Sequence, residues 1–385
     1  MNKKLKQTIV LFLFFILLVV IFSGCFENEQ KSEEEALLVP DVKLDQPSIL
    51  PDWKDGEYHD YYDTIQMLNF FDEQYPDLVN IFSIGKSVLG KDICCIRLTN
   101  ENNTKPKLSC LIDGCIHGDE WEAGDACLYL AEYLLINFDN NETITNILNS
   151  SKIYIVPILN PDGREADERF TDNGVDPNRN FDVFFGKIRG KSFRLGKLFG
   201  IIKIPVIKFF SKNPMIYLWN SGRFPFSEPE TQAIRDLMND LDIQDFSFYV
   251  NCHTALHTIV MPWLAYKPPF EMTSNEKNVF DHVVEWIVDN TEYEAFRGEG
   301  YEYKTGGDAM DWCFKTFRIP SFTFEICSID YDPWFGGKHD SLVHWMKSTL
   351  PFFMYLFVNI DNLHQWKTPD IQPSLPEGIP PEPLQ

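Results

Sequence analysis

Residues 107–138, KLSCLIDGCIHGDEWEAGDACLYLAEYLLINF, decide the fold of this chain of 385 residues. The first part, KLSCLIDGCIHG, reads as a buried strand that runs into a turn, because its apolar run ends in glycine-containing sequence. From Asp119 onward apolar residues recur at helical spacing and predict a long amphipathic helix. The junction carries His117 and Glu120, so the stretch places polar side chains where a strand ends.

The rest of the chain continues this alternation. Strand-like runs lie at 80–100 (two strands around a turn), 152–163, 245–256 and 319–328, and helical spacing lies at 61–76, 228–241 and 276–290. Alternating strands and helices predict an α/β domain with a mostly parallel sheet. Ligands bind such sheets beyond the carboxyl ends of the strands. His117, Asn160, His253 and Glu325 all fall at or near a predicted strand end.

Composition limits the class of protein. With 44% hydrophobic and 15% aromatic residues, the chain can bury one large core. Its net charge of -23 argues against nucleic acid as a partner, which requires a basic surface. No polar or Pro-rich linker divides the interior, so we expect one principal domain at residues 57–362.

The two ends of the chain differ from this domain. Residues 1–24 have the basic, apolar and small-residue layout of a signal peptide, and Cys25 follows in a Ser-Gly-Cys sequence that resembles a bacterial-type lipidation site. An uncleaved anchor helix is the alternative. Either interpretation predicts a domain held at the outer face of the cytoplasmic membrane by an acidic tether, residues 25–56. Residues 363–385 are Pro-rich and predict an extended tail.

The cysteines allow two interpretations. Nine cysteines in an exported protein suggest disulfides. Most of them lie in apolar, strand-like or helical runs, however, which favours buried free thiols. No CxxC pair is present, so a cysteine zinc site is not expected.

Two histidines and a glutamate form a candidate metal site. His117 and Glu120 are three residues apart at a strand–helix junction, so one turn presents both to one ion, and His253 at the end of another strand supplies a third ligand. Such a set leaves a position open, as in catalytic zinc sites. His282 and Glu285 have the same spacing, but they lie inside a plain amphipathic helix and are assigned to its solvated face.

Six short motifs carry a resemblance to a known family. The order HGDE, NPDG, GVDPNRNF, SEPET, CHT and FTFE resembles the M14 metallocarboxypeptidases, the zinc carboxypeptidases, from about Tyr58 to about Val358. The resemblance implies a three-layer α/β/α sandwich around a mixed, largely parallel eight-stranded sheet. It also implies one zinc ion, Zn2+, held by His117, Glu120 and His253.

The same resemblance implies the catalytic roles. Glu325 matches the general base that activates the zinc-bound water. Asn178 and Arg179 match the pair that binds the terminal carboxylate of the substrate, and Arg169 matches the arginine that polarises the scissile carbonyl and stabilises the oxyanion. Arg164, in the same loop, has no counterpart.

Three further positions concern the substrate. Tyr303 matches the mobile tyrosine that closes over the bound carboxylate, with Tyr301 as a competitor. Met310 lies where the family sets the pocket for the last side chain, which suggests apolar or aromatic C-terminal residues. Asp308 replaces the usual glycine and could also admit Lys or Arg.

The expected function is therefore a zinc-dependent carboxypeptidase acting on peptide or protein C-termini. Cell-wall-type peptides or N-acyl amino acids are alternative substrates, because they also carry a free carboxylate. A catalytically dead peptide-binding lipoprotein would have no use for Glu325, and a receptor or adhesin explains none of the motifs.

Residues 183–224 are expected to be an insertion relative to the family. Between Val183 and Ser227 there are nine Lys or Arg and no Asp or Glu, interleaved with apolar residues. One interpretation is a subdomain that packs on the catalytic core. The other is an element that binds the membrane interface, with basic residues at anionic headgroups and apolar side chains beneath them.

Overall fold

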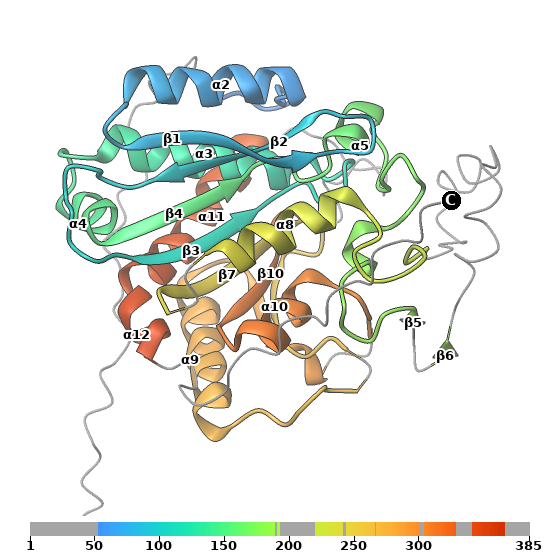
Figure 1. The fold of residues 1–385 in the computed structure, drawn as a ribbon. Helices are drawn as coiled ribbons and strands as arrows, with labels where there is room; N and C mark the ends of the chain where they lie inside the picture. The colour runs from blue at the N-terminus through green and yellow to red at the C-terminus, as the bar shows by residue number, and fades with distance from the viewer. Residues whose placement is uncertain are drawn as a thin grey trace, which may run out of the picture. The chain divides into compact units, whose positions relative to one another are not determined.

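An eight-stranded mixed sheet forms the centre of the structure (Figure 1). This computed structural model describes residues 53–188, 191–192, 220–241, 244–265, 267–300, 304–328 and 341–365. The strands follow the order β1-β2-β4-β3-β7-β10-β8-β9. The eight are β1 (Val79–Lys86), β2 (Asp92–Leu98), β3 (Leu108–Asp113), β4 (Ser151–Val156), β7 (Phe246–His253), β8 (Thr258–Met261), β9 (Glu294–Arg297) and β10 (Ser321–Glu325).

The middle of the sheet is parallel. The pairs β4–β3, β3–β7 and β7–β10 are parallel, as is β8–β9 at one edge. The pairs β1–β2, β2–β4 and β10–β8 are antiparallel. The predicted mixed, largely parallel eight-stranded sheet is confirmed. Two very short strands, β5 (Lys187–Ile188) and β6 (Lys191–Ser192), pair separately.

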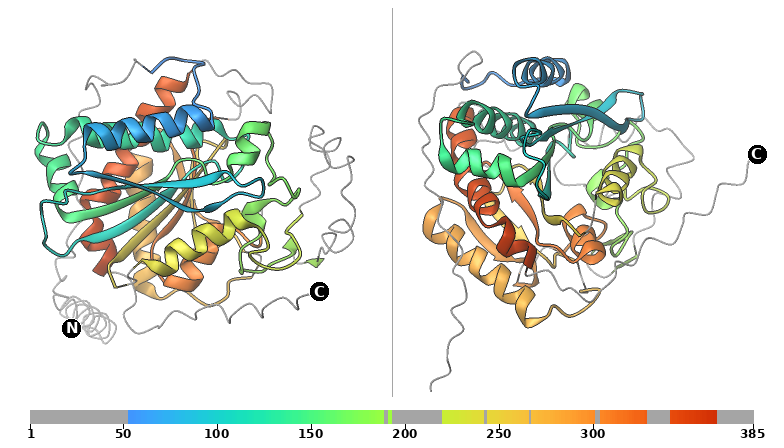
Figure 2. Two further views of the ribbon diagram at one scale, coloured as in Figure 1. Left: turned by 45° about the horizontal axis from the view of Figure 1, so that its top comes forward. Right: turned by 60° about the vertical axis from the view of Figure 1, so that its left-hand side comes forward.

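Helices cover both faces of the sheet (Figure 2). In the right-hand view α3 and α11 lie on one side of the strands and α8 and α10 lie on the other. The helices are α2 (Tyr61–Gln74), α3 (Trp121–Asn137), α4 (Glu142–Ser150), α5 (Pro161–Ala166), α8 (Pro229–Asp240), α9 (Ser274–Asn290), α10 (Ala309–Phe317), α11 (Leu342–Val358) and α12 (Ile360–Gln365), with 3-10 turns at Pro177–Arg179 and Gly298–Gly300.

The central strands lie deepest in the core. All eight residues of β7 are buried, and so are five of the six residues of β3. A strand covered by helices on both faces needs a nearly continuous apolar run, which is what these segments have. Because β3, β7 and β10 are mutually parallel through β7, their carboxyl ends meet at one edge, and the candidate site residues follow those ends.

Several predictions fall outside the described residues. These are the leader and Cys25, the acidic tether up to residue 52, the tail from residue 366, and most of the insertion, residues 189–190 and 193–219. Among the helices that the structure describes, none combines the length and the apolar character needed to cross a bilayer.

The described cysteines are free thiols. Eight are present, seven of them buried, while Cys94 is half-buried. The preference for buried thiols over disulfides is confirmed for this part of the chain. Burial raises the pKa of thiols such as Cys95 and Cys110, which keeps them protonated and unreactive.

Candidate metal centre and substrate-binding loop

The three predicted metal ligands come together at the carboxyl edge of the sheet. His117 lies in the turn after β3, Glu120 directly precedes α3, and His253 is the last residue of β7. One ligand atom of each lies within 4.8 Å of the others, and all three side chains are buried. The described residues hold no second His/Cys/Asp/Glu cluster of this kind.

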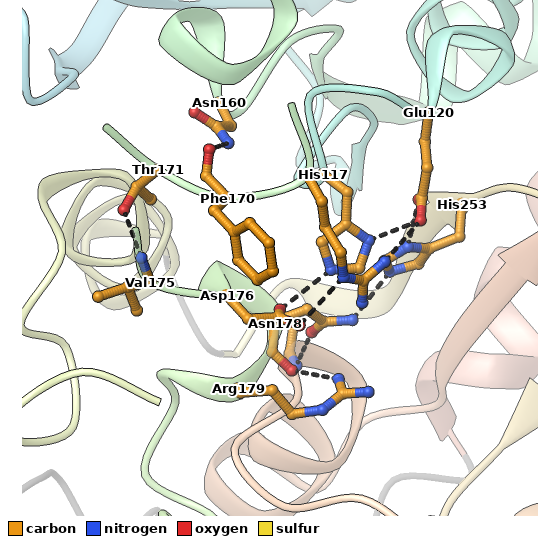
Figure 3. A network of polar contacts seen from close by, with 12 residues as sticks. His117, Glu120, Asn160, Phe170, Thr171, Val175, Asp176, Asn178, Arg179 and His253 are labelled. Atoms are coloured by element: carbon orange, nitrogen blue, oxygen red, sulfur yellow. Dashed lines mark hydrogen bonds and ion pairs between the residues drawn. The ribbon is translucent and has the colours of Figure 1, made fainter. Parts of the chain in front are cut away.

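Both imidazoles face the same carboxylate through Nδ1. His117 Nδ1 lies 2.7 Å from Glu120 Oε1, and His253 Nδ1 lies 2.7 Å from Glu120 Oε2. Figure 3 shows the two rings turned toward Glu120. Two imidazole nitrogens and one carboxylate that converge on one point form a donor set that suits a zinc ion with a position left open.

The far nitrogens of both rings also have partners. His117 Nε2 lies 3.1 Å from Asp176 Oδ1, and His253 Nε2 lies 2.5 Å from Asn251 Oδ1 and 2.9 Å from Asn178 Nδ2. Metal-binding histidines nearly always use the second nitrogen in this way, which fixes the ring and its tautomer. The residues therefore fit zinc in their donor atoms and in their supporting contacts.

The charged groups at the centre shift the pKa values of the neighbouring carboxyl groups. Burial would raise the pKa of Glu120, but the imidazoles of His117 and His253 hold it below its usual range. Burial also opposes ionisation of Asp176, and the Arg169 guanidinium and His117 hold the pKa of Asp176 below its usual range. Two ionised carboxylates therefore flank His117.

One glycine allows this turn to form. A Cβ at Gly118 would lie 2.0 Å from the carbonyl carbon of Gly163 in α5. Backbone cannot move away cheaply at that distance, so the residue after His117 must lack a side chain. The HGDE turn owes its close approach to α5 to this residue.

Glu325 lies beside the metal ligands in the sheet. It ends β10 and stands directly opposite His253 in the parallel register. The Ile326 amide donates to the His253 carbonyl at 2.8 Å and fixes the two strand ends to each other. The predicted general base and a predicted ligand are thus neighbours on adjacent strands.

Arg169 reaches the same place from the loop of residues 169–181, the clamp loop. Its Nη1 lies 3.2 Å from Glu120 Oε1 and its Nε lies 3.1 Å from Asp176 Oδ2. The guanidinium is therefore positioned against the metal ligand Glu120 and against Asp176, the carboxylate that contacts His117. Asp176 belongs to the GVDPNRNF motif, but the sequence does not predict its contact with His117.

Asn178 and Arg179 lie in the short 3-10 turn of the clamp loop. Both are buried, Asn178 Oδ1 accepts from the Ala309 amide at 2.8 Å, and Arg179 Nη1 donates to the Asn178 carbonyl at 2.6 Å. Gly307 packs on this turn, since its φ is +82° and a Cβ there would lie 2.2 Å from the Arg179 oxygen. These contacts fix the start of α10 and the clamp loop relative to each other.

A buried amide, also missed from the sequence, anchors the clamp loop. Asn180 Nδ2 donates to the carbonyls of Ser221 and Phe224 and to Ser227 Oγ, while its Oδ1 accepts from the Glu228 amide and Thr231 Oγ1.

Glu228, in the SEPET motif, completes this anchor. Its Oε2 accepts from Thr171 Oγ1 at 2.9 Å and Asn173 Nδ2 at 3.0 Å. The final asparagine of NRNF and the first glutamate of SEPET are therefore structural residues that position the clamp.

The predicted specificity positions have different surroundings. Met310 is fully buried in an apolar cluster with Val260 and Leu264. Asp308 is 2% exposed and caps α10, accepting from the Asp311 amide at 2.9 Å and from Thr305 Oγ1 at 2.7 Å. These contacts favour a structural role for Asp308 over contact with a Lys or Arg side chain of a substrate.

Tyr303 and Tyr301 lie outside the described residues. Arg164, which had no predicted role, donates to the His59 carbonyl at 2.6 Å and lies over the Trp121 ring at 4.5 Å, so it holds the N-terminal segment against α3. Asn160 caps α5.

His282 and Glu285 lie on α9, away from the metal cluster, as expected. His282 is half-buried and its Nδ1 lies 2.9 Å from the Asn278 carbonyl of its own helix.

Comparison with known proteins agrees with this geometry. Residues 64–333 match the family model described as Zinc carboxypeptidase. The chain is 23% identical to carboxypeptidase O of Bos taurus over 81% of each chain. It is also 23% identical to carboxypeptidase A1 of Sus scrofa, over 70% of this chain and 62% of that protein.

Solved structures show the same fold. Bovine thrombin-activatable fibrinolysis inhibitor, solved in complex with tick carboxypeptidase inhibitor, matches with a TM-score of 0.61 at 20% identity, over 80% of this chain and 98% of that one. Carboxypeptidase A from Helicoverpa armigera matches with a TM-score of 0.60 at 19% identity, over 80% of this chain and 74% of that one.

Proposed function

This chain belongs to the zinc carboxypeptidase family and is a zinc-dependent metallocarboxypeptidase; we propose that Glu325 is its general base and that Arg179 selects free peptide C-termini. The observation that carries the proposal is the convergence of His117, Glu120 and His253 at one sheet edge, with Glu325 opposite His253 and with Asn178, the neighbour of Arg179, 2.9 Å from His253. A centre with a base but no carboxylate-binding group would not restrict cleavage to chain ends.

Glu325 accepts a proton from the attacking water. Zinc, when bound by His117, Glu120 and His253, supplies a Lewis acid that polarises the carbonyl and acidifies water. Glu325 stands opposite His253 in the register, which supports a place for its carboxylate beside this ligand set. It then returns the proton to the leaving amine, as one carboxylate serves as both base and acid.

The two arginines bind different negatively charged groups of the substrate. Arg179 pairs with the terminal carboxylate, because a guanidinium binds a carboxylate through two parallel hydrogen bonds. Arg169 already lies against Glu120 and Asp176, next to the metal position, and it stabilises the oxyanion that forms at the scissile carbonyl. The distance between these two arginines sets where the scissile bond lies.

The last side chain of the substrate is apolar or aromatic in this proposal. Met310, on the first turn of α10, forms an apolar cluster with Val260 and Leu264, and burial of an apolar side chain against this cluster would exclude water. Asp308 is committed to its helix cap. Tyr303 is proposed as the residue that closes over the carboxylate.

A panel of N-blocked dipeptides tests the proposal. We expect hydrolysis of Phe, Leu and Met C-termini, slower hydrolysis of Lys and Arg C-termini, and loss of all activity with a chelator. The same assay with cell-wall-type peptides and N-acyl amino acids tests the alternative substrates. Exclusive hydrolysis of either alternative class would replace peptides as the substrate.

We further propose that the enzyme acts at the outer face of the cytoplasmic membrane. The support is the sequence alone: the apolar leader with Cys25, and nine Lys or Arg between Val183 and Ser227. One lipid chain needs a second signal for stable anchoring, which this basic segment would supply. A chain lacking residues 1–33 should float with anionic liposomes at low salt and less at high salt. Equal binding to neutral vesicles, or no binding, would rule this role out.

A further inference from the structure

Three polar side chains lie on one face of the central strand β7. Tyr249, Asn251 and His253 alternate along the strand, so they share a face. They are 0%, 0% and 2% exposed. The neighbouring strand β3 places Asp113, also fully buried, opposite Asn251 in the register. Such groups need hydrogen-bond partners, because burial of an unpaired polar group is costly.

These four residues form a chain of hydrogen bonds that ends at the metal ligand. The Tyr249 hydroxyl donates to Asp113 Oδ2 at 2.6 Å, and Asn251 Nδ2 donates to Asp113 Oδ1. An ionised carboxylate only accepts, so the amide nitrogen of Asn251 must face Asp113. Its carbonyl oxygen then faces His253 Nε2, at 2.5 Å, and requires a proton there.

A second amide competes for the same ring nitrogen. Asn178 Nδ2 lies 2.9 Å from His253 Nε2, and its orientation follows from Oδ1, which accepts from the Ala309 amide. One nitrogen cannot donate to Asn251 and accept from Asn178. In a neutral imidazole that ligates through Nδ1, the proton is on Nε2, so Asn251 is the true partner. The Asn178 amide protons are then available to another acceptor.

We propose that Asn251 is a positioning residue that holds His253 as its Nε2–H tautomer. This directs the Nδ1 lone pair at the metal and leaves the Asn178 amide for the substrate carboxylate. Asp113 fixes the orientation of Asn251, and Tyr249 fixes Asp113. The effect on His253 depends only on the metal site, whereas the effect on Asn178 rests on the proposed function.

Zinc affinity without substrate tests the proposal. Asn251→Leu keeps the approximate volume and removes both polar atoms, so the zinc dissociation constant should rise about 10- to 100-fold. Burial raises the pKa of Asp113 to about 7, so the measurement belongs above that pH, where Asp113 is ionised. Ser247→Ala, on the same strand but bonded to His364 Nδ1 at 3.2 Å, is the control and should leave zinc affinity unchanged.

Two further measurements separate tautomer control from packing. Nuclear magnetic resonance of the zinc-loaded wild type should show a slowly exchanging proton on His253 Nε2, and the spectrum of the cobalt-substituted protein should change in Asn251→Leu but not in Ser247→Ala. If Asn251→Leu does not fold, Tyr249→Phe removes one donor from Asp113 and should show a smaller loss in the same direction. Wild-type zinc affinity in folded Asn251→Leu, or in Tyr249→Phe where it must stand in, overturns the proposal. Because no substrate is present, this result is independent of the peptidase assignment.

Discussion

The metal centre and the clamp loop lie next to each other but are held in place by different kinds of hydrogen bond. His253 and Glu325 end two paired parallel strands, so the backbone ladder of the sheet sets their positions. The clamp loop contains only one 3-10 turn, and the side chains of Asn180 and Glu228 set its position. The sheet therefore positions His253 and Glu325, and a network of buried polar side chains positions the loop that carries Asn178 and Arg179.

The largest effect on the reaction rate is expected at Glu325, which ends strand β10. Glu325→Gln keeps the shape of the side chain and removes the base, so the rate should fall by about 10²- to 10⁴-fold. Zinc should remain bound, because the three ligands are unchanged, and metal analysis of the purified variant checks this. Wild-type-like turnover would remove Glu325 from the mechanism.

A smaller effect is expected at the clamp. Arg179→Ala should lower kcat/KM for peptides with free C-termini by about 30- to 5,000-fold, equivalent to about 2–5 kcal/mol, mainly through KM, because a buried charge-assisted pair is lost. Arg164→Ala is the matched control: it removes an arginine bonded to the His59 carbonyl and should lower the unfolding temperature without changing KM. Equal KM changes in both variants would contradict the division of roles.

Loss of a side chain from the network that supports the clamp loop should have a smaller effect on activity and should also lower the stability of the fold. Asn180→Ala leaves four donors or acceptors of the 221–228 segment without this partner and should destabilise the fold by about 1–3 kcal/mol. KM should rise while zinc affinity stays at the wild-type value. A loss of zinc affinity of the same size would show that the loop and the metal centre are not separable.

The smallest effect on activity is expected at Glu230, where only stability should change. Glu230 is fully buried on α8, where burial raises its pKa from 4.5 to about 7 and its Oε1 accepts from the Val88 amide. The folded state then binds more protons than the unfolded state, so this group lowers stability as pH rises through that window. Relative to wild type, Glu230→Gln should gain about 2–3 kcal/mol between about pH 5 and pH 8 in urea unfolding. If the stabilities of Glu230→Gln and of the wild type changed with pH in the same way, the raised pKa of Glu230 would be contradicted.

The same contrast explains what the sequence could predict. Strand-end residues such as His117, His253 and Glu325 were identified because an apolar run marks the strand and a motif marks its end. Fold class followed from the alternation of such runs with amphipathic helices.

The supporting residues were not found, because their partners lie far along the chain. Asp176 supports His117 across 59 residues, and Asn251 reaches Asp113 across 138 residues. One signal was present for Asn251: it alternates with Tyr249 and His253 in a buried, mainly apolar strand, where a polar residue needs a partner. Asn180 gave no such signal, since asparagine is common in loops.

The central claim is that a zinc centre and an arginine clamp act together on a free chain end. The most direct test compares an N-blocked dipeptide ending in Phe with its C-terminal amide, using the zinc-loaded protein with and without a chelator. We expect hydrolysis of the free acid only, its loss with the chelator and its return with added zinc. Cleavage of the amide at the rate of the acid, or activity that persists without metal, would contradict the account.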